Sequence, residues 1–114
     1  MTITKLVNLT PHNINVKGNI ISTSGTIARV KVIQEEVPAI IVEGNLLPIF
    51  ECKYGEVENL PEPQEGVMYI VSAMVRSACL GRTDILSPCN FLRDKEGKII
   101  GCGGLEINKS TFLP

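Results

Sequence analysis

The pattern of hydrophobic and polar positions changes its period in the stretch from Gly66 to Pro88. Val67 to Val71 is a short apolar run with β-branched and aromatic members, which is typical of a buried strand. Ser72 is suited to cap a helix, because its side-chain oxygen can accept a hydrogen bond from a free backbone N–H. Ala73 to Leu80 is rich in good helix formers, and Gly81 is suited to end the helix. The stretch therefore predicts a strand, a sharp turn and a two-turn helix.

The residues before this stretch predict several short strands. Thr2 to Leu9 is expected to be the first strand, and Pro11 ends it because proline cannot donate to a ladder. Ile27 to Ile33 alternates most clearly, with Arg29 and Lys31 on one face. The other expected segments are a hairpin arm at Ile14–Val16, a turn at Gly18–Asn19, a short strand at Ile20–Ile21, a solvated turn at Gln34–Glu36, apolar segments at Pro38–Val42 and Leu46–Tyr54, and an acidic surface loop at Gly55–Gly66.

A last hairpin is expected after the helix. Phe91–Arg93 forms one arm, Asp94–Gly97 the turn and Lys98–Cys102 the other arm, since Gly97 supplies the positive φ that such turns need. Leu105–Ile107 is expected to be a final edge strand. The sequence thus predicts an α+β fold: a β-rich single domain over residues 1–114, with about seven short strands and one principal short helix packed on the sheet.

Composition narrows the classes of partner. The chain has 114 residues, of which 44% are hydrophobic and 20% charged, which favours one folded domain over disorder. A net charge of -1 and an aromatic content of 4% argue against nucleic-acid binding. No apolar run approaches the ~20 residues of a membrane span, and the N-terminus lacks the apolar centre of a signal peptide. We expect no nucleic acid, no membrane partner and a cytoplasmic location.

The cysteines and the histidine form no recognisable metal motif. The four cysteines, Cys52, Cys79, Cys89 and Cys102, include no Cys-x-x-Cys pair, and His12 is the only histidine. We expect reduced thiols, no metal ion and no cofactor.

The strongest candidate binding residues follow the buried strand. Ser72 and Arg76 lie one helical turn apart, and Arg82 and Asp84 come just after the helix. Arginine suits phosphate contacts and aspartate suits a ribose hydroxyl, so the group is a candidate anion site. The alternative is a plain helix cap, a surface Arg76 and a structural ion pair at Asp84.

Two other candidates lie nearer the N-terminus. Ser24 belongs to a hydroxyl-rich loop followed by the basic Arg29, which is either a cradle for a polar ligand or a solvated hairpin turn. His12 is a surface residue, a ligand contact or a general base, but the sequence identifies neither a nucleophile nor an orienting group for it. No catalytic residue is therefore assigned, and anion binding without metal chemistry is the favoured interpretation.

Several segments resemble a family of small proteins encoded by tailed phages and prophages. The resemblance rests on Asn8-Leu9-Thr10-Pro11-His12, Leu60-Pro61-Glu62-Pro63, Tyr69-Ile70-Val71-Ser72-Ala73, Arg82-Thr83-Asp84, and Arg93-Asp94 with Gly97-Lys98-Ile99-Ile100-Gly101-Cys102. It covers most of the chain and is weakest over residues 33–52.

This resemblance implies a viral context in the cytoplasm of a host cell. By analogy with small phage antagonists of host defence, it implies a homo-oligomer that binds and sequesters a nucleotide-like immune signal. The expected ligand-binding set is Asn8, Thr10, His12, Ser24, Arg29, Ser72, Arg76, Arg82 and Asp84. One alternative is an inhibitor that blocks a host defence enzyme by surface contact. The other is a metal-independent hydrolase or lyase that uses His12.

Overall fold

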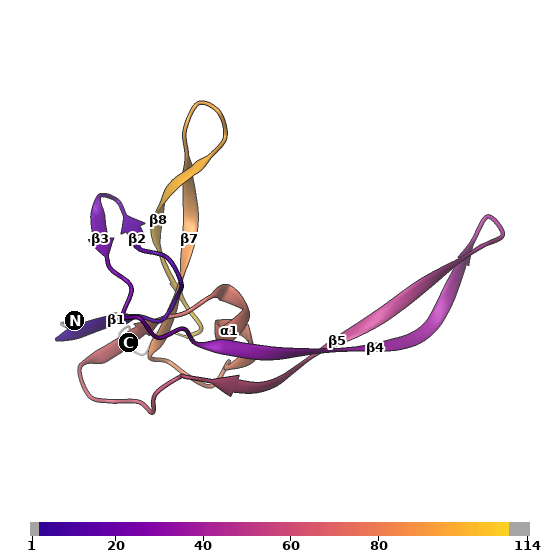
Figure 1. Cartoon of the computed structure of the whole chain (residues 1–114), viewed down its shortest axis with the longest axis horizontal. Helices are drawn as coiled ribbons and strands as arrows, with labels where there is room; N and C mark the ends of the chain where they lie inside the picture. Colours follow the sequence, from indigo (N-terminus) through magenta and orange to yellow (C-terminus); the bar gives the residue numbers. More distant parts are fainter. Residues whose placement is uncertain (1–2, 110–114) are drawn as a thin grey trace.

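A six-stranded sheet and a long two-stranded arm make up the computed structural model, which describes residues 3–109 (Figure 1). The described elements are β1 (Lys5–Asn8), β2 (Ile14–Val16), β3 (Asn19–Ile21), β4 (Arg29–Val42), β5 (Asn45–Glu58), β6 (Val67–Ile70), α1 (Ala73–Ala78), β7 (Ile85–Arg93) and β8 (Ile99–Ile107). The sheet has the order β1-β6-β7-β8-β2-β3, and β4 pairs only with β5. The β-rich α+β prediction is confirmed, with eight strands in place of about seven.

One side of the sheet is parallel, whereas its middle pair, β7 and β8, is antiparallel. β6 pairs in parallel with β1 on one side and with β7 on the other. A strand enclosed on both sides and both faces is expected to be a continuous apolar run, and Met68, Tyr69 and Ile70 are all buried. Ile14–Val16 is a hairpin arm, as predicted, but its partner is the following strand β3 and not the first strand. β2 turns back onto β3 through Lys17 and Gly18, both at positive φ.

The helix packs on this sheet and closes the core. Ser72 caps it as predicted, because its Oγ accepts a hydrogen bond from Val75 N at 3.2 Å. The helix ends at Ala78, two residues before the predicted end. The main core cluster consists of Leu9, Ala28, Tyr69, Val71, Val75 and Ile85, and Met68, Ile70 and Cys102 are also buried.

The β4–β5 arm is the largest departure from the predicted strand pattern. Each of its strands has 14 residues, and Glu43 and Gly44, both at positive φ, form the turn between them. The solvated turn predicted at Gln34–Glu36 is wrong, because these residues pair with Cys52, Glu51 and Phe50 within the ladder. Likewise, the first four residues of the loop predicted at Gly55–Gly66 belong to β5, which ends at Glu58.

Two prolines lie inside the arm without breaking it. Pro38 lies between the pairs Val37–Ile49 and Ile40–Leu47, where the register shifts. Pro48 lies in the same interval on β5. Proline has no N–H to give to a ladder and is tolerated at such irregularities, so the arm bends there and continues.

The last hairpin confirms its predicted turn. Gly97 N donates to Asp94 O at 3.0 Å, and Gly97 has a φ of +83°. The flanking strands are longer than predicted, since β7 begins at Ile85 and β8 runs to Ile107. Leu105–Ile107 is therefore the end of β8, paired with β7, and not a separate edge strand.

The two hairpins give the molecule an open shape. The β4–β5 arm and the β7–β8 hairpin leave the body in different directions, with a free corner between them (Figure 1). The radius of gyration is 17.7 Å and the longest extent is 58 Å. A compact domain of this length has a radius of gyration of about 13 Å. The arm therefore lies largely outside the packed body.

Candidate functional site

A hollow lies where the arm joins the body, and we call it the root hollow. It has a volume of about 350 Å³. Its lining residues are Leu9, Thr10, Pro11, Ile27, Ala28, Arg29, Val30, Ser72, Met74 and Val75. Three of the residues predicted to bind a ligand, Thr10, Arg29 and Ser72, therefore lie around one hollow, together with apolar side chains.

Arg29 is the cation of the root hollow. It is the first residue of β4 and is exposed. Glu58 is its partner in the ladder, yet within residues 3–109 no carboxylate lies within 4.0 Å of the Arg29 guanidinium and no acceptor hydrogen-bonds to it. Its N–H donors are thus available to a ligand that enters the hollow.

The two hydroxyls of the root hollow differ in their availability. Thr10 Oγ1 lies 2.7 Å from Asn8 Oδ1 and 3.0 Å from His12 O, so its single proton is already engaged. Ser72 Oγ accepts from Val75 N, and among the described residues its own O–H has no acceptor. Ser72 can therefore donate to a ligand while it caps the helix.

Asn8 is the centre of a buried hydrogen-bond cluster. Its side-chain N–H groups donate to His12 O at 2.8 Å and Ile21 O at 3.0 Å. Its Oδ1 accepts from Thr10 N at 3.0 Å and from the Thr10 hydroxyl. Ser24 Oγ donates to the backbone oxygen of Asn8 at 2.8 Å. The two N–H donors and the two acceptor sites of the Asn8 side chain are all hydrogen-bonded, so Asn8 fastens the turn after β1 to the end of β3.

This cluster gives the Asn-Leu-Thr-Pro-His segment a structural role. It holds Asn8, Thr10, Ser24 and the backbone of His12 together, and Leu9 points into the core with 2% of its surface exposed. Of the residues predicted to bind a ligand, Asn8 and Ser24 thus have internal partners in this structure. The segment forms one wall of the root hollow through Leu9, Thr10 and Pro11.

His12 projects into a different hollow of about 340 Å³. Its lining is His12, Asn13, Ile14, Asn15, Pro88, Phe91, Ile99, Ile100, Gly101 and Cys102. Within the described chain the imidazole makes no hydrogen bond. The structure therefore separates His12 from Arg29 and Ser72.

Arg76 is held by three partners inside the fold. Its Nε donates to Ser87 Oγ at 2.7 Å, and its two terminal nitrogens donate to Asn108 Oδ1 at 2.9 Å and Glu106 Oε2 at 2.8 Å. The Arg76 side chain is 15% exposed. These bonds join the helix to the ends of β7 and β8, which leaves little of the guanidinium for a ligand.

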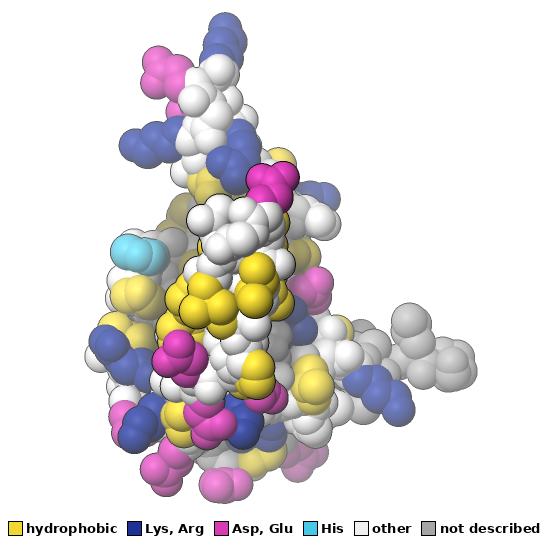
Figure 2. Space-filling model, turned by 90° about the vertical axis from the view of Figure 1, so that its right-hand side faces the viewer, with side chains coloured by type: hydrophobic (Ala, Val, Ile, Leu, Met, Phe, Trp, Pro, Cys, Tyr) yellow, Lys and Arg dark blue, Asp and Glu magenta, His cyan; other side chains and the backbone are white. Residues whose placement is uncertain are grey.

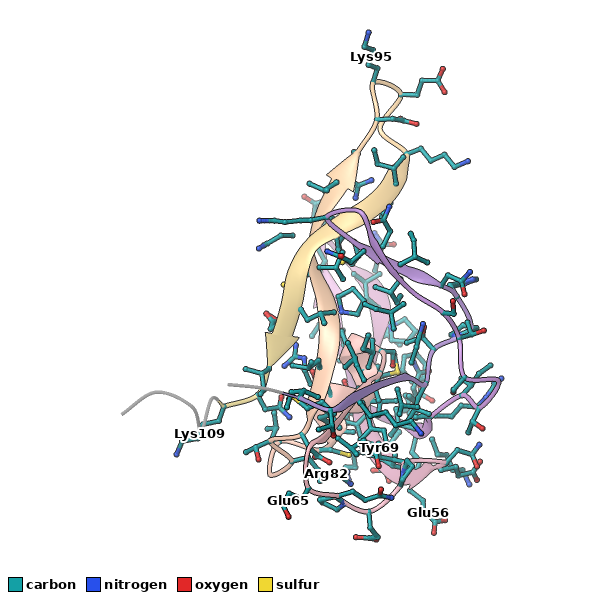
Figure 3. All side chains as sticks on the ribbon, turned by 90° about the vertical axis from the view of Figure 1, so that its left-hand side faces the viewer. Glu56, Glu65, Tyr69, Arg82, Lys95 and Lys109 are labelled. Carbon is teal, nitrogen blue, oxygen red and sulfur yellow. The ribbon has the colours of Figure 1, made fainter. Side chains whose placement is uncertain are left out.

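Arg82 and Asp84 also pair with each other. Figure 3 shows Arg82 at the opposite end of the body from Lys95, which marks the tip of the β7–β8 hairpin. A side-chain hydrogen bond and the charge of Asp84 raise the pKa of Arg82, against a smaller opposing effect of partial burial. A terminal nitrogen of Arg82 also donates to Pro61 O at 2.8 Å. The pair secures the acidic loop before β6.

Asn108 is an important residue that the sequence analysis missed. Its Nδ2 lies within hydrogen-bond distance of the backbone oxygens of Arg76, Cys79 and Arg82, at 3.2, 2.9 and 3.3 Å. It therefore adds a side-chain donor at the C-terminal end of the helix, where the carbonyls of Arg76 and Cys79 also accept from Cys79 N and Arg82 N. An asparagine just after an apolar strand was the available signal, but the contact spans 32 residues.

Other features restrict the chemistry of the described chain. Nowhere in residues 3–109 do three or more His, Cys, Asp or Glu side chains cluster as metal ligands would. No helix in that range is long and apolar enough to cross a membrane.

All four cysteines are free thiols. Every buried side-chain nitrogen and oxygen in the same range has a hydrogen-bond partner, so unsatisfied donors occur only at exposed positions.

Comparison of the chain with protein-family models, with curated proteins and with solved structures finds no match.

Proposed function

We propose that this protein binds an anionic, nucleotide-like small molecule in the root hollow and sequesters it without changing it chemically. The observation that carries the proposal is the position of Arg29. It is a cation without an intramolecular partner among the described residues, and it lines the same hollow as the free hydroxyl of Ser72 and several apolar side chains. The arginines predicted for this role, Arg76 and Arg82, have internal partners instead.

The chemistry of the hollow suits such a ligand. A guanidinium gives charge-assisted and often bidentate hydrogen bonds to phosphate oxygens. The Ser72 hydroxyl adds one donor, and Ile27, Val30 and Met74 offer apolar surface to a base or sugar. Sequestration requires only these contacts. The resemblance to phage proteins supports a host immune signal as the ligand and the host cytoplasm as the location.

The test is isothermal titration calorimetry with adenosine monophosphate and a cyclic dinucleotide as probes. Adenosine, which lacks the phosphate, is the matched ligand control. We expect Arg29→Ala to weaken binding of the anionic probes by about tenfold or more, because a hydrogen bond to a charged group contributes roughly 1.5–3 kcal/mol. Arg29→Lys should retain part of the affinity, since lysine keeps the positive charge but cannot give the two parallel hydrogen bonds of a guanidinium.

The matched protein control is Lys31→Ala. Lys31 is an exposed cation two residues further along β4 and outside the root hollow. It should bind the probes as the wild type does. Affinity lost equally in both variants would indicate a general charge effect and contradict a site at Arg29. Ligand recovered as a chemically altered product after denaturation would contradict sequestration.

A further inference from the structure

The outer half of the arm, residues 37–50, is apolar and exposed, and we call it the outer arm. Glu43, in the turn, is the one charged residue between Val37 and Phe50. Ile41 is 71% exposed, Leu46 68% and Phe50 55%. In Figure 2, where the arm points toward the viewer, hydrophobic side chains gather at its end.

Both faces of the outer arm are hydrophobic. Ile40 pairs with Leu47 and Ile41 pairs with Leu46. Successive side chains of a strand point to opposite faces, so these neighbouring pairs lie on opposite faces of the ribbon. A solvated antiparallel pair normally keeps one polar face. The outer arm has no such face.

The inner half of the same arm has a charged surface, unlike the apolar outer arm. Around Glu35, Glu51 and Lys53 it carries charge, and Lys53 Nζ donates to Glu35 Oε2 at 3.1 Å. The surface of the arm thus changes along its length. The inner half, which we call the stem, is charged and solvated, whereas the outer arm is apolar and suited to burial. The helix contacts the arm near its root, and the outer arm extends beyond the body (Figure 1). Within the described chain, nothing covers it.

We propose that a second copy of this chain covers the outer arm, by reciprocal exchange of arms along the β7–β8 hairpin. That hairpin exposes its own apolar side chains, namely Phe91, Leu92, Ile99 and Ile100. The arm and the hairpin border the same free corner of the molecule (Figure 1). A two-fold axis through this corner places the arm of each copy against the hairpin of the other, which is the self-complementary arrangement of most homodimers. This proposal goes beyond ligand binding and does not depend on it.

The charges of the two surfaces are complementary. The stem of the arm is acidic on balance, with Glu35, Glu36, Glu51, Glu56 and Glu58 against Arg29, Lys31 and Lys53. The hairpin tip carries Arg93, Lys95 and Lys98 against Asp94 and Glu96, and Lys and Arg side chains are prominent on it in Figure 2. The carboxylate of Asp94 already accepts hydrogen bonds from Glu96 N and Lys98 N. Complementary charges of this kind fix the orientation of an interface.

The dimensions of the outer arm agree with a reciprocal exchange. The outer arm holds six residues of each strand, 37–42 of β4 and 45–50 of β5. At ~3.4 Å per residue and a width of ~10 Å for two strands, each of its faces has an area on the order of 200 Å². A stable interface buries about 800 Å² per partner. The two faces of one outer arm supply about half of that area, and in a reciprocal exchange the hairpin of the same copy, which receives the partner's arm, supplies the rest.

The experiment measures molar mass by light scattering across a dilution series of the full chain. We expect the wild type to have twice the monomer mass of 12.4 kDa, or another even multiple of it. The arm variant combines Ile41→Lys with Leu46→Glu, so that the opposed pair becomes polar but remains attractive. The hairpin variant is Ile100→Glu. Both should raise the dimer dissociation constant at least tenfold, and circular dichroism should show an unchanged fold.

The matched control is Leu80→Glu, because Leu80 is as exposed as the arm residues, at 70%, but lies after the helix. This variant should keep the wild-type mass. A wild type that stays monomeric at every concentration overturns the proposal and leaves the arm to a different protein, such as a host enzyme. An arm variant with the wild-type mass also overturns it. Dissociation by the arm variant but not by Ile100→Glu excludes the β7–β8 hairpin as the seat.

Discussion

Arg82 and Asp84, two residues apart, form a bidentate ion pair in which two guanidinium nitrogens donate to the two carboxylate oxygens. Arg82 Nε donates to Asp84 Oδ1 at 2.7 Å and a terminal nitrogen donates to Oδ2 at 2.7 Å. The side chains are only 22% and 15% exposed. A partly buried bidentate pair is stronger than an ordinary surface pair, and losing one partner leaves the other without compensation.

Arg82→Ala should lower the free energy of unfolding by about 1–3 kcal/mol, because Asp84 then loses a charged hydrogen-bond partner. Chemical denaturation measures the change, and a double-mutant cycle with Asp84→Ala isolates the pair. Nucleotide affinity per folded molecule should not change. Its loss in a stable Arg82→Ala protein would return Arg82 to the binding site.

The effect of Arg82→Ala should also be constant across neutral pH. Asp84 raises the pKa of Arg82, and stability from a group with a raised folded-state pKa is fully present below its unfolded-state pKa. It is lost only as the pH rises through the folded-state pKa, far into the alkaline range. Unfolding energies of wild type and variant at pH 7 and pH 9 should therefore differ by the same amount, and a difference that shrinks by pH 9 would contradict this assignment.

Asn8→Asp should destabilise the fold strongly although the side chains have the same shape. The change replaces two donors by an oxygen that faces the carbonyls of His12 and Ile21. We expect a loss of about 2–4 kcal/mol, because both carbonyls lose a donor and a charge becomes buried. The control is Asn13→Asp, where the side chain serves as an acceptor for Thr23 N and stays exposed. Equal melting temperatures for the two variants would show that the Asn8 cluster contributes little.

All four cysteines should react with an alkylating reagent in denaturant without any reductant, because they are free thiols. Under native conditions Cys102 should react last, since it is 2% exposed. Intact mass after timed labelling measures both statements. A protein that takes up label only after reduction would contradict the first, and early labelling of Cys102 would contradict the second.

The sequence was sufficient where a signal is local. Ser72 caps its helix through a contact with a residue three positions away, and Gly97 closes a four-residue turn. The length of the β4–β5 arm, in contrast, depends on pairing between strands and not on a local signal. Glu35 and Glu36 are poor strand residues, and they lie in a strand because β5 supplies backbone partners across from them. Propensity cannot reveal that context.

The candidate site was predictable only in part for the same reason. The proximity of Arg82 and Asp84 in the chain already indicated a structural pair as one alternative. Arg76 gave no such indication, because its partners Ser87 and Asn108 are 11 and 32 residues away. Arg29 was included in the binding set, but its separation from His12 follows from the path of β2 and β3, which periodicity does not determine.

The parallel pairing of β1 with β6 determines the order in which the chain can fold. Lys5 pairs with Val67, so β1 lacks its ladder partner until residues 62 positions further along the chain have been synthesised. The arm closes through contacts between neighbouring strands and can form earlier. Until β6 arrives, Val7 and Leu9 are exposed on a nascent chain beside a ready-made apolar hairpin. We therefore expect a chain whose synthesis stalls before β6 to be more prone to aggregation than the complete chain.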